Sequence, residues 1–164
     1  MSFTIRKTTL NEIDIIMKLI EYGKEKMRED GNLNQWTNGE PNESLIKKDI
    51  ENGNSYIILL DKEPIGTFAF ISGPDSTYLK IYEGKWLNDD NYYVLHRIAG
   101  KYKGKGLMKQ ILNFCFSKTN NIRIDTHRDN NIMRHILDKE GFKYCGIIYL
   151  EDNDERLAYQ KIIN

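Results

Sequence analysis

The chain has 164 residues, with 24 basic and 24 acidic side chains and a formal net charge of zero at pH 7. This length suits a single domain, 1–164, with its own hydrophobic core. The balanced charge argues against general attraction to nucleic acid or acidic lipid, and no apolar run approaches the roughly 20 residues of a membrane span. The first ten residues lack the apolar segment of a secretory signal, so we expect a cytoplasmic protein.

Two cysteines, Cys115 and Cys145, lie in apolar stretches. Buried, reduced thiols are therefore a better interpretation than a disulfide. Neither the cysteines nor the three histidines show the spacing of metal ligands, and we expect no metal.

The first 52 residues predict a strand and helices. Phe3 and Ile5 begin the strand, and Thr9 with Glu12 three positions later forms a capping box at the start of an amphipathic helix. Residues 24–41 are polar and rich in turn formers, which is compatible with a second helix followed by a loop. Residues 42–52 again show helical spacing.

The next 40 residues predict a hairpin and an insert. Residues 55–60 and 65–72 are apolar and flank a tight turn, as in an antiparallel pair. Residues 73–91 then carry Tyr78, Tyr82, Trp86 and Leu87 at helical spacing. This pattern predicts a short helix whose aromatic stripe packs on the body, and the sharper alternative is the wall of a substrate site.

The centre of the chain predicts a strand, a glycine-rich turn and a helix. Residues 92–99 are apolar and aromatic, residues 100–106 contain three glycines and three lysines, and apolar residues then recur at helical spacing to about Ser117. Glycines before a helix start let backbone N–H groups approach an anion, because the first-turn N–H groups have no partner of their own. We therefore expect this turn to hold a diphosphate.

The last third predicts strand, helix and two strands. Residues 121–127 alternate between apolar and polar, and Asp129 or Asn130 caps a helix that Gly141 ends. Residues 144–150 and 155–162 are two further strands. The whole order predicts an α+β fold with a mixed, mostly antiparallel sheet, helices on both faces and one parallel pair, formed across the central helix.

Two common phosphate-binding motifs do not match. The stretch from Gly100 is one residue short of a P-loop, and Gly106 stands where that loop has its magnesium-binding Ser or Thr. A dinucleotide fold also fails, because no repeated βαβ unit surrounds the turn.

The turn and the helix after it resemble the GCN5-related N-acetyltransferases. That family has (Q/R)-x-x-G-x-(G/A) between a strand and a helix, followed later by an Asn about a dozen residues before a Gly-Phe pair. Residues 103–108 (KGKGLM) match the first element, although the letters also fit a register that starts at Lys101. Asn130 and Gly141-Phe142 match the second. The order of elements agrees along almost the whole chain.

The resemblance implies that acetyl-CoA is bound as cosubstrate. Main-chain groups of the strand would pair with the pantetheine arm, the turn would hold the diphosphate, and Asn130 would bond the pantetheine. The implied cofactor-binding residues are His96, Arg97, Ile98, Lys103, Gly104, Lys105, Gly106, Leu107, Met108 and Asn130.

The implied activity is transfer of an acetyl group to a primary amine of a small molecule or peptide, by direct attack in a ternary complex. His96 is the first candidate for the general base, because it lies on the strand expected to carry the thioester. A hydrogen-bonded core histidine is an equally good interpretation. His127 is the second candidate, and Tyr149 or Tyr93 would be the acid. His135 should be solvated.

The acceptor cannot be read from the sequence, but aromatic residues border its expected side. The candidate substrate-binding residues are Trp36, Tyr78, Tyr82 and Trp86. Members of the family often form homodimers, which nothing in this sequence specifies.

One departure supports a different function. The family often has a Tyr that protonates the departing thiolate, and Leu137 stands at that position here. The alternative is therefore a non-catalytic acyl-CoA-binding or regulatory module on the same fold. A nucleic-acid binder that uses Lys101, Lys103 and Lys105 is a third reading, which the neutral net charge disfavours.

Overall fold

The structure is a computed structural model that describes residues 2–37, 39–101 and 106–164. Seven strands form one sheet in the order β1-β2-β3-β4-β5-β7-β6, and every neighbouring pair is antiparallel except β4 and β5. The strands are β1 (Phe3–Lys7), β2 (Ser55–Leu60), β3 (Glu63–Ser72), β4 (Tyr93–Gly100), β5 (Asn121–Thr126), β6 (Lys143–Tyr149) and β7 (Glu155–Ile162). The helices are α1 (Ile13–Glu29), α2 (Glu43–Glu51), α3 (Leu107–Phe116) and α4 (Asn131–Lys139), with short 3₁₀ turns η1 (Leu10–Glu12) and η2 (Ser76–Tyr78).

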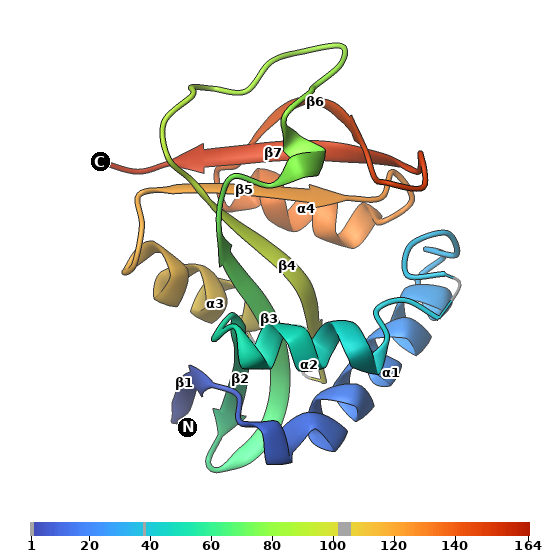
Figure 1. Ribbon diagram of the computed structural model, residues 1–164, viewed down its shortest axis with the longest axis vertical. Coiled ribbons are helices and arrows are strands. Elements are labelled where there is room, and N and C mark those ends of the chain that lie inside the picture. Colours follow the sequence, from blue (N-terminus) through green and yellow to red (C-terminus); the bar gives the residue numbers. More distant parts are fainter. Residues whose placement is uncertain (1, 38, 102–105) are drawn as a thin grey trace.

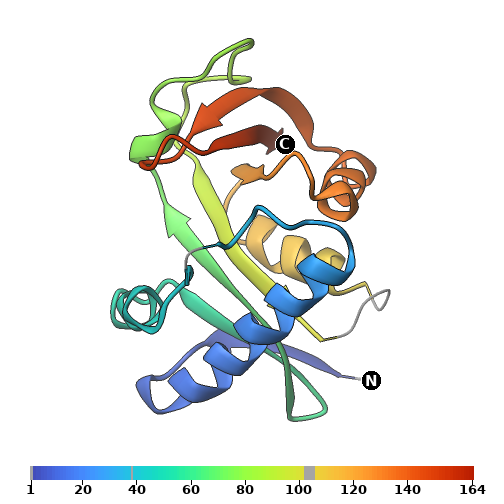
Figure 2. The ribbon, with the colours of Figure 1, turned by 90° about the vertical axis from the view of Figure 1, so that its right-hand side faces the viewer.

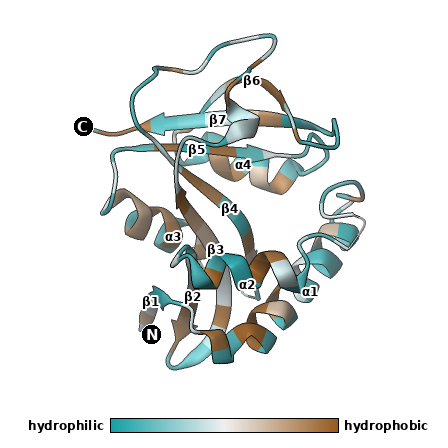
Figure 3. Ribbon diagram, viewed as in Figure 1, coloured by the Kyte–Doolittle hydropathy of each residue, from teal (hydrophilic) through white to brown (hydrophobic). Residues whose placement is uncertain are grey.

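Helices cover both faces of the sheet (Figures 1 and 2). α1 and α2 pack through Ile16, Ile20 and Ile46 on one face, whereas Ile111 of α3 and Leu137 of α4 are buried on the other. Hydrophobic residues concentrate in β2–β4 and on α3, and the segment between η2 and β4 is mainly hydrophilic or neutral (Figure 3). The predicted mixed sheet with helices on both faces and one parallel pair is confirmed.

β4 and β5 are paired only over a short length. The parallel ladder joins Tyr93 to Ile122 and Val94 to Arg123, and no further pair follows. β4 nevertheless continues to Gly100, paired on its other side with β3. The two strands therefore diverge, and the main chain of β4 from Leu95 onward has no strand on its β5 side.

A bulge at Arg97 changes the course of β4 in the diverging part. Arg97 has a φ of 52°, and the β3–β4 register shifts between Thr67 and Ala69. A left-handed conformation costs roughly 1–2 kcal/mol for a residue with a Cβ. The Arg97 guanidinium makes two bonds to the buried Asp49 of α2, Nε to Oδ2 at 2.7 Å and Nη2 to Oδ1 at 2.8 Å. This bidentate pair fixes the bulge to α2 and offsets its strain.

Helix ends follow the signals in the sequence, with one exception that matters for the site. Asn42 and Asn130 cap α2 and α4 by accepting bonds from the N–H groups of Leu45 and Met133. Gly141, at a φ of 87°, ends α4. α3 instead follows Gly106, which has a φ of 69° and no side chain to cap the helix.

Two predicted elements are wrong. The stretch 24–41 does not begin a second helix, because α1 continues through Lys24 to Glu29 and a loop follows. Residues 73–91 form no helix beyond the η2 turn, despite their helical spacing. Tyr82 makes an isolated bridge with Ile147, and a Cβ at Gly84 would collide with the Cys145 carbonyl, so residues 82–84 lie directly against β6.

Among the described residues, no helix combines the length and the apolar character needed to cross a membrane. Cys115 and Cys145 are both buried and free, as predicted.

Replacing Asp49 with Ala tests the support of the bulge. The change leaves the Arg97 guanidinium without its partner in a mostly buried position, so we expect the free energy of unfolding to fall by about 2–4 kcal/mol. Urea unfolding measures it. Glu51→Ala, an exposed acidic residue on the same helix, is the control and should stay within about 0.5 kcal/mol of the parent. Equal stabilities of the two variants would contradict this role of Asp49.

Candidate active site

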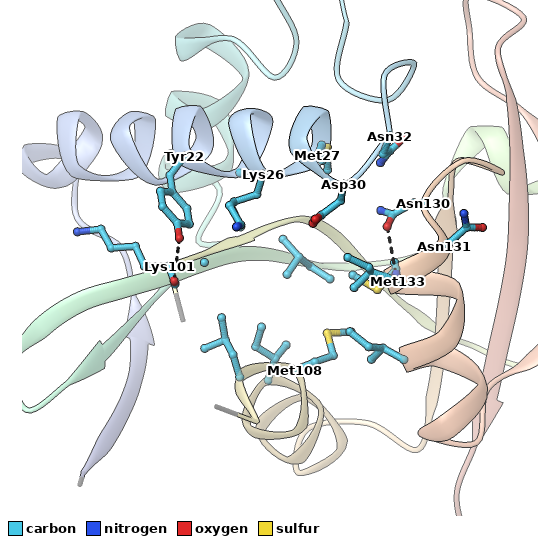
Figure 4. A pocket seen from close by; sticks show the side chains of 18 of the residues that line it. Tyr22, Lys26, Met27, Asp30, Asn32, Lys101, Met108, Asn130, Asn131 and Met133 are labelled. Carbon is cyan, nitrogen blue, oxygen red and sulfur yellow. Dashed lines mark hydrogen bonds between the residues drawn. The ribbon is translucent and has the colours of Figure 1, made fainter. Parts of the chain in front are cut away.

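The larger cavity in the structure has a volume of about 430 Å³ and lies between α1, the end of β4 and the first turns of α3 and α4. In Figure 4, Lys26 and Met27 of α1 project toward it, Met108 of α3 lies opposite, and Asn130 and Met133 stand at the start of α4. These contributors come from four segments that are distant in the sequence, so the fold must form before the cavity exists.

The lining of this cavity suits a long ligand with an anionic group. Apolar side chains such as Ile98, Leu107 and Met108 form much of its wall, and Lys109 lies in the first turn of α3, whose start has no side-chain cap. The first N–H groups of that helix have no intrahelical partner, and the helix dipole favours negative charge there. A pantetheine arm with a diphosphate matches this donor set.

The cofactor-binding residues expected from the sequence are distributed over two places. Ile98, Gly106, Leu107, Met108 and Asn130 line the larger cavity. His96 and Arg97 do not, and line the smaller cavity described below. Lys103, Gly104 and Lys105 lie outside the described residues, so their part in the diphosphate site stays a prediction.

The Asn130 side chain already has two partners. Its Oδ1 accepts from the N–H of Met133 at 3.0 Å, and its Nδ2 donates to Oε1 of Gln35 at 3.1 Å. The same Gln35 oxygen accepts from Asn32 Nδ2 at 3.0 Å and from the His127 N–H at 3.4 Å. One amide N–H of Asn130 is left for a ligand.

A smaller cavity of about 200 Å³ lies where β4 and β5 diverge. Four residues line both cavities and so mark their junction. They are Met27, Ile98, Asn130 and Met133. None of these four side chains titrates in the physiological range, so the junction itself holds no acid or base.

His96 lies in the smaller cavity beside a carboxylate that fixes its tautomer. Its Nε2 is 3.0 Å from Oδ2 of Asp75. Burial alone would raise the pKa of the Asp75 carboxyl, but hydrogen bonds with His96 and from Thr77 outweigh burial and lower that pKa from 3.8 to about 2. Asp75 is thus an ionised acceptor, which favours a proton on His96 Nε2.

A second carboxylate, Asp125, lies on the other side of the imidazole. Its Oδ2 is 3.9 Å from His96 Nδ1, too far for a hydrogen bond, and accepts a 2.6 Å bond from the Tyr78 hydroxyl. Burial and the Asp125 charge raise the pKa of Tyr78 well above its usual value, so Tyr78 remains a donor. Asp125 lines the cavity and Asp75 does not, which places Nδ1 on the cavity side.

The other two candidates for catalysis lie elsewhere. His127 lines neither cavity, and its Nδ1 accepts the N–H of Asp129 at 2.9 Å. Burial and the charge of Arg156 lower the pKa of His127. Tyr149 is exposed on β6 and packs edge-on against Tyr82. His135 is exposed, as expected.

Of the four aromatic residues expected around the acceptor, only Trp36 lines a cavity. It belongs to the loop after α1 and stands beside His96 and Arg97 in the smaller cavity. Tyr78 is fully buried in the core. Trp86 covers the guanidinium of Arg123 at 4.1 Å, and Tyr82 packs on Tyr149.

Sequence reasoning missed Asp75 and Arg156. Asp75 follows Gly73-Pro74 and looks like an ordinary turn residue, and Arg156 looks like one more charge at the start of a strand. No three His, Cys, Asp or Glu side chains in the described part of the chain are placed to hold a metal ion.

Comparison with known proteins identifies the family of this arrangement. The sequence profile of the acetyltransferase (GNAT) family matches residues 21–142. A GNAT-family acetyltransferase from Streptococcus agalactiae is 39% identical, with a TM-score of 0.91 over 99% of this chain and 96% of its own. No curated protein sequence matches the chain.

Two further solved structures share the fold at lower identity. A GNAT-family acetyltransferase from Listeria monocytogenes is 22% identical, with a TM-score of 0.74 over 98% of this chain and 95% of its own. Arabidopsis thaliana Naa50, in complex with the bisubstrate analogue CoA-Ac-MVNAL, is 12% identical, with a TM-score of 0.66 over 99% of this chain and 100% of its own.

Replacing Asp75 with Asn tests the ionised state of this carboxylate. Because the pKa of Asp75 is lower in the folded chain, its charge stabilises the fold above about pH 4, and this contribution is lost as the pH falls toward 2. We expect Asp75→Asn to cost about 1–2 kcal/mol at pH 7, after allowance for solvent screening, and progressively less below pH 4. Urea unfolding from pH 7 to pH 3 measures the difference, and a pH-independent difference would contradict the assignment.

Proposed function

The chain belongs to the GNAT acetyltransferase family, and from this membership we propose that it transfers the acetyl group of acetyl-CoA to a primary amine. The transfer takes place by direct attack, with both substrates bound at once. One observation carries the proposal: a cavity suited to CoA meets a second cavity that is lined by His96, whose imidazole lies between two carboxylates.

The larger cavity would hold acetyl-CoA, which supplies a reactive acetyl thioester. The uncapped start of α3, with Lys109 in its first turn, would hold the diphosphate. The open edge of β4 around Ile98 would pair with the pantetheine, as an added strand does. Naa50 in its bisubstrate complex is a protein of the same fold that binds CoA linked to an acceptor, which supports this arrangement.

His96 would act as the general base. An alkyl ammonium group must lose a proton before its nitrogen can attack a carbonyl carbon. Asp125 is placed to attract the ammonium group, and Nδ1 of His96 is placed to take its proton. The imidazolium so formed lies between the carboxylates of Asp75 and Asp125, which stabilise its charge.

The leaving group would depart without an acid from the protein. The amine nitrogen bonds to the acetyl carbon and releases its second proton to solvent, the carbon–sulfur bond breaks, and the sulfur leaves as a thiolate that takes a proton from solvent. The four residues at the junction carry no titratable side chain, and Leu137 is fully buried in the core. A thiol of pKa near 8.5 is a good enough leaving group for this route. An N–H of the open β4 edge would stabilise the developing oxyanion.

Acetyl-CoA should raise the melting temperature of the protein, because a ligand that binds only the folded state stabilises it. At 100 times the dissociation constant the gain is about 2.7 kcal/mol, which corresponds to roughly 5 °C for a chain of this size. Thermal unfolding with and without acetyl-CoA measures the shift. No shift at millimolar acetyl-CoA or CoA would remove the proposed cosubstrate.

Replacing His96 with Ala should lower kcat by about 100-fold or more, the usual contribution of a general base, and leave the affinity for acetyl-CoA within about twofold. CoA release against a panel of amines measures turnover. His135→Ala removes an exposed histidine from α4 and should keep the parent rate. An unchanged rate in His96→Ala would exclude this base.

The same measurements separate the non-catalytic alternative. A protein that binds acetyl-CoA but acetylates no amine in the panel would be an acyl-CoA-binding or regulatory module.

A further inference from the structure

The smaller cavity contains a charged side chain that the transfer reaction does not use. Arg156 of β7 is only 6% exposed and lines this cavity. Its Nη1 donates to the carbonyl oxygen of Glu155 at 2.9 Å. Within the described part of the chain no carboxylate lies within 4.0 Å of its guanidinium, and the Glu155 carboxylate pairs with Arg128 instead. A buried cation without a counter-ion is costly, so a ligand anion would gain from binding here.

A second buried polar residue, whose side chain lacks a hydrogen-bond partner, lines the same cavity. Thr126, at the end of β5, is 1% exposed, and its Oγ1 has no hydrogen-bond partner. Thr126 pairs with Leu157, the residue after Arg156, so the side chains of Thr126 and Arg156 leave neighbouring strands on opposite faces of the sheet and line the cavity from its two sides. Leaving a buried hydroxyl unpaired costs about 1–3 kcal/mol, which a ligand oxygen would recover.

A negative charge, that of Asp125, lines the same cavity. Asp125 pairs with Ala158, two residues along β7 from Arg156, which corresponds to roughly 7 Å of strand. The Asp125 carboxylate beside His96 suits an ammonium group, whereas Arg156 and Thr126 suit an anion. The cavity is thus complementary to a molecule that carries both charges a short distance apart.

We propose that the acceptor is a small amino acid, whose amine faces His96 and Asp125 and whose carboxylate is held by Arg156 and Thr126. This inference rests on the proposed function. A guanidinium can bind a carboxylate through two parallel N–H···O bonds. The cavity volume of about 200 Å³ lies below the range for drug-sized ligands, which favours a small acceptor over a peptide.

The test compares amino acids with their carboxamides, which keep the amine and lose the negative charge. The probes are L-alanine, β-alanine and 4-aminobutanoate, each beside its amide, with acetyl-CoA saturating and CoA release as the readout. The measured quantity is the ratio of kcat/KM for acid and amide. Dividing the ratio of a variant by that of the parent cancels the different basicities of the two amines.

Arg156→Gln should lower the acid-to-amide ratio at least tenfold, mainly through a higher KM for the acid, because the charge-assisted bonds are lost. Arg134→Gln removes an equal charge from α4, outside both cavities, and should leave the ratio unchanged. The melting-temperature shift caused by acetyl-CoA shows whether each variant is folded.

Thr126→Val gives a second reading if Arg156→Gln does not fold. It removes the unpaired hydroxyl at nearly constant shape, so we expect an unchanged or higher melting temperature together with a severalfold higher KM for the acid. A purely structural threonine would give the reverse pattern, a lower melting temperature and an unchanged KM.

The outcomes separate this inference from the proposed function. Equal use of acids and amides, with a ratio that Arg156→Gln leaves unchanged, would overturn the amino-acid acceptor and keep the acetyltransferase. Faster acetylation of amides or peptides would favour a peptide acceptor and also overturn it. If no amine releases CoA, the transfer activity fails, and calorimetric titration of the same acids and amides into the CoA-bound protein decides. Binding of the acid that is lost in Arg156→Gln supports the carboxylate site, and absence of binding overturns it.

Discussion

The divergence of β4 from β5 is the constraint on which the rest of the structure depends. Two paired positions hold the strands together at one end. Beyond them Arg97 adopts a left-handed conformation, and its ion pair with Asp49 offsets the strain of that conformation. Both cavities border the resulting gap. The ion pair between α2 and β4 therefore acts on function although neither side chain takes part in the chemistry. The pair stabilises the bulged course of β4, in which β4 and β5 are separated.

The chemistry of the site follows from how charges are placed around one imidazole. Asp75, outside the cavity, is ionised and so fixes the proton of His96 on Nε2. Asp125 lines the cavity, where its carboxylate can attract a bound cation, and it lies too far from His96 for a hydrogen bond. The imidazole and the Asp125 carboxylate therefore line the same cavity. The acidic group that the family often supplies at position 137 is replaced by packing, because Leu137 belongs to the core.

The sequence predicted the order of elements and the family well, since periodicity, capping residues and glycines act locally. Asn42, Asn130 and Gly141 end or begin helices where expected. The insert 73–91 misled because its aromatic spacing is helical, whereas each ring packs on a different neighbour. The partnership of Asp75 with His96 joins residues that are distant in the sequence and depends on the path of that insert. The burial of Arg156 in the smaller cavity could not be predicted either, because the sequence pattern around it is that of an ordinary charged residue at a strand start.

Gln35 forms hydrogen bonds to segments that line both cavities. Its single carbonyl oxygen accepts from the loop itself at Asn32, from the backbone of His127 and from the cap of α4 at Asn130. The next residue, Trp36, lines the smaller cavity, while Asn130 lines both. The loop after α1 and the first turn of α4 are thus joined by hydrogen bonds to one side chain. A displacement of either element would break hydrogen bonds that both share, so the position of the loop and that of the α4 start depend on one another.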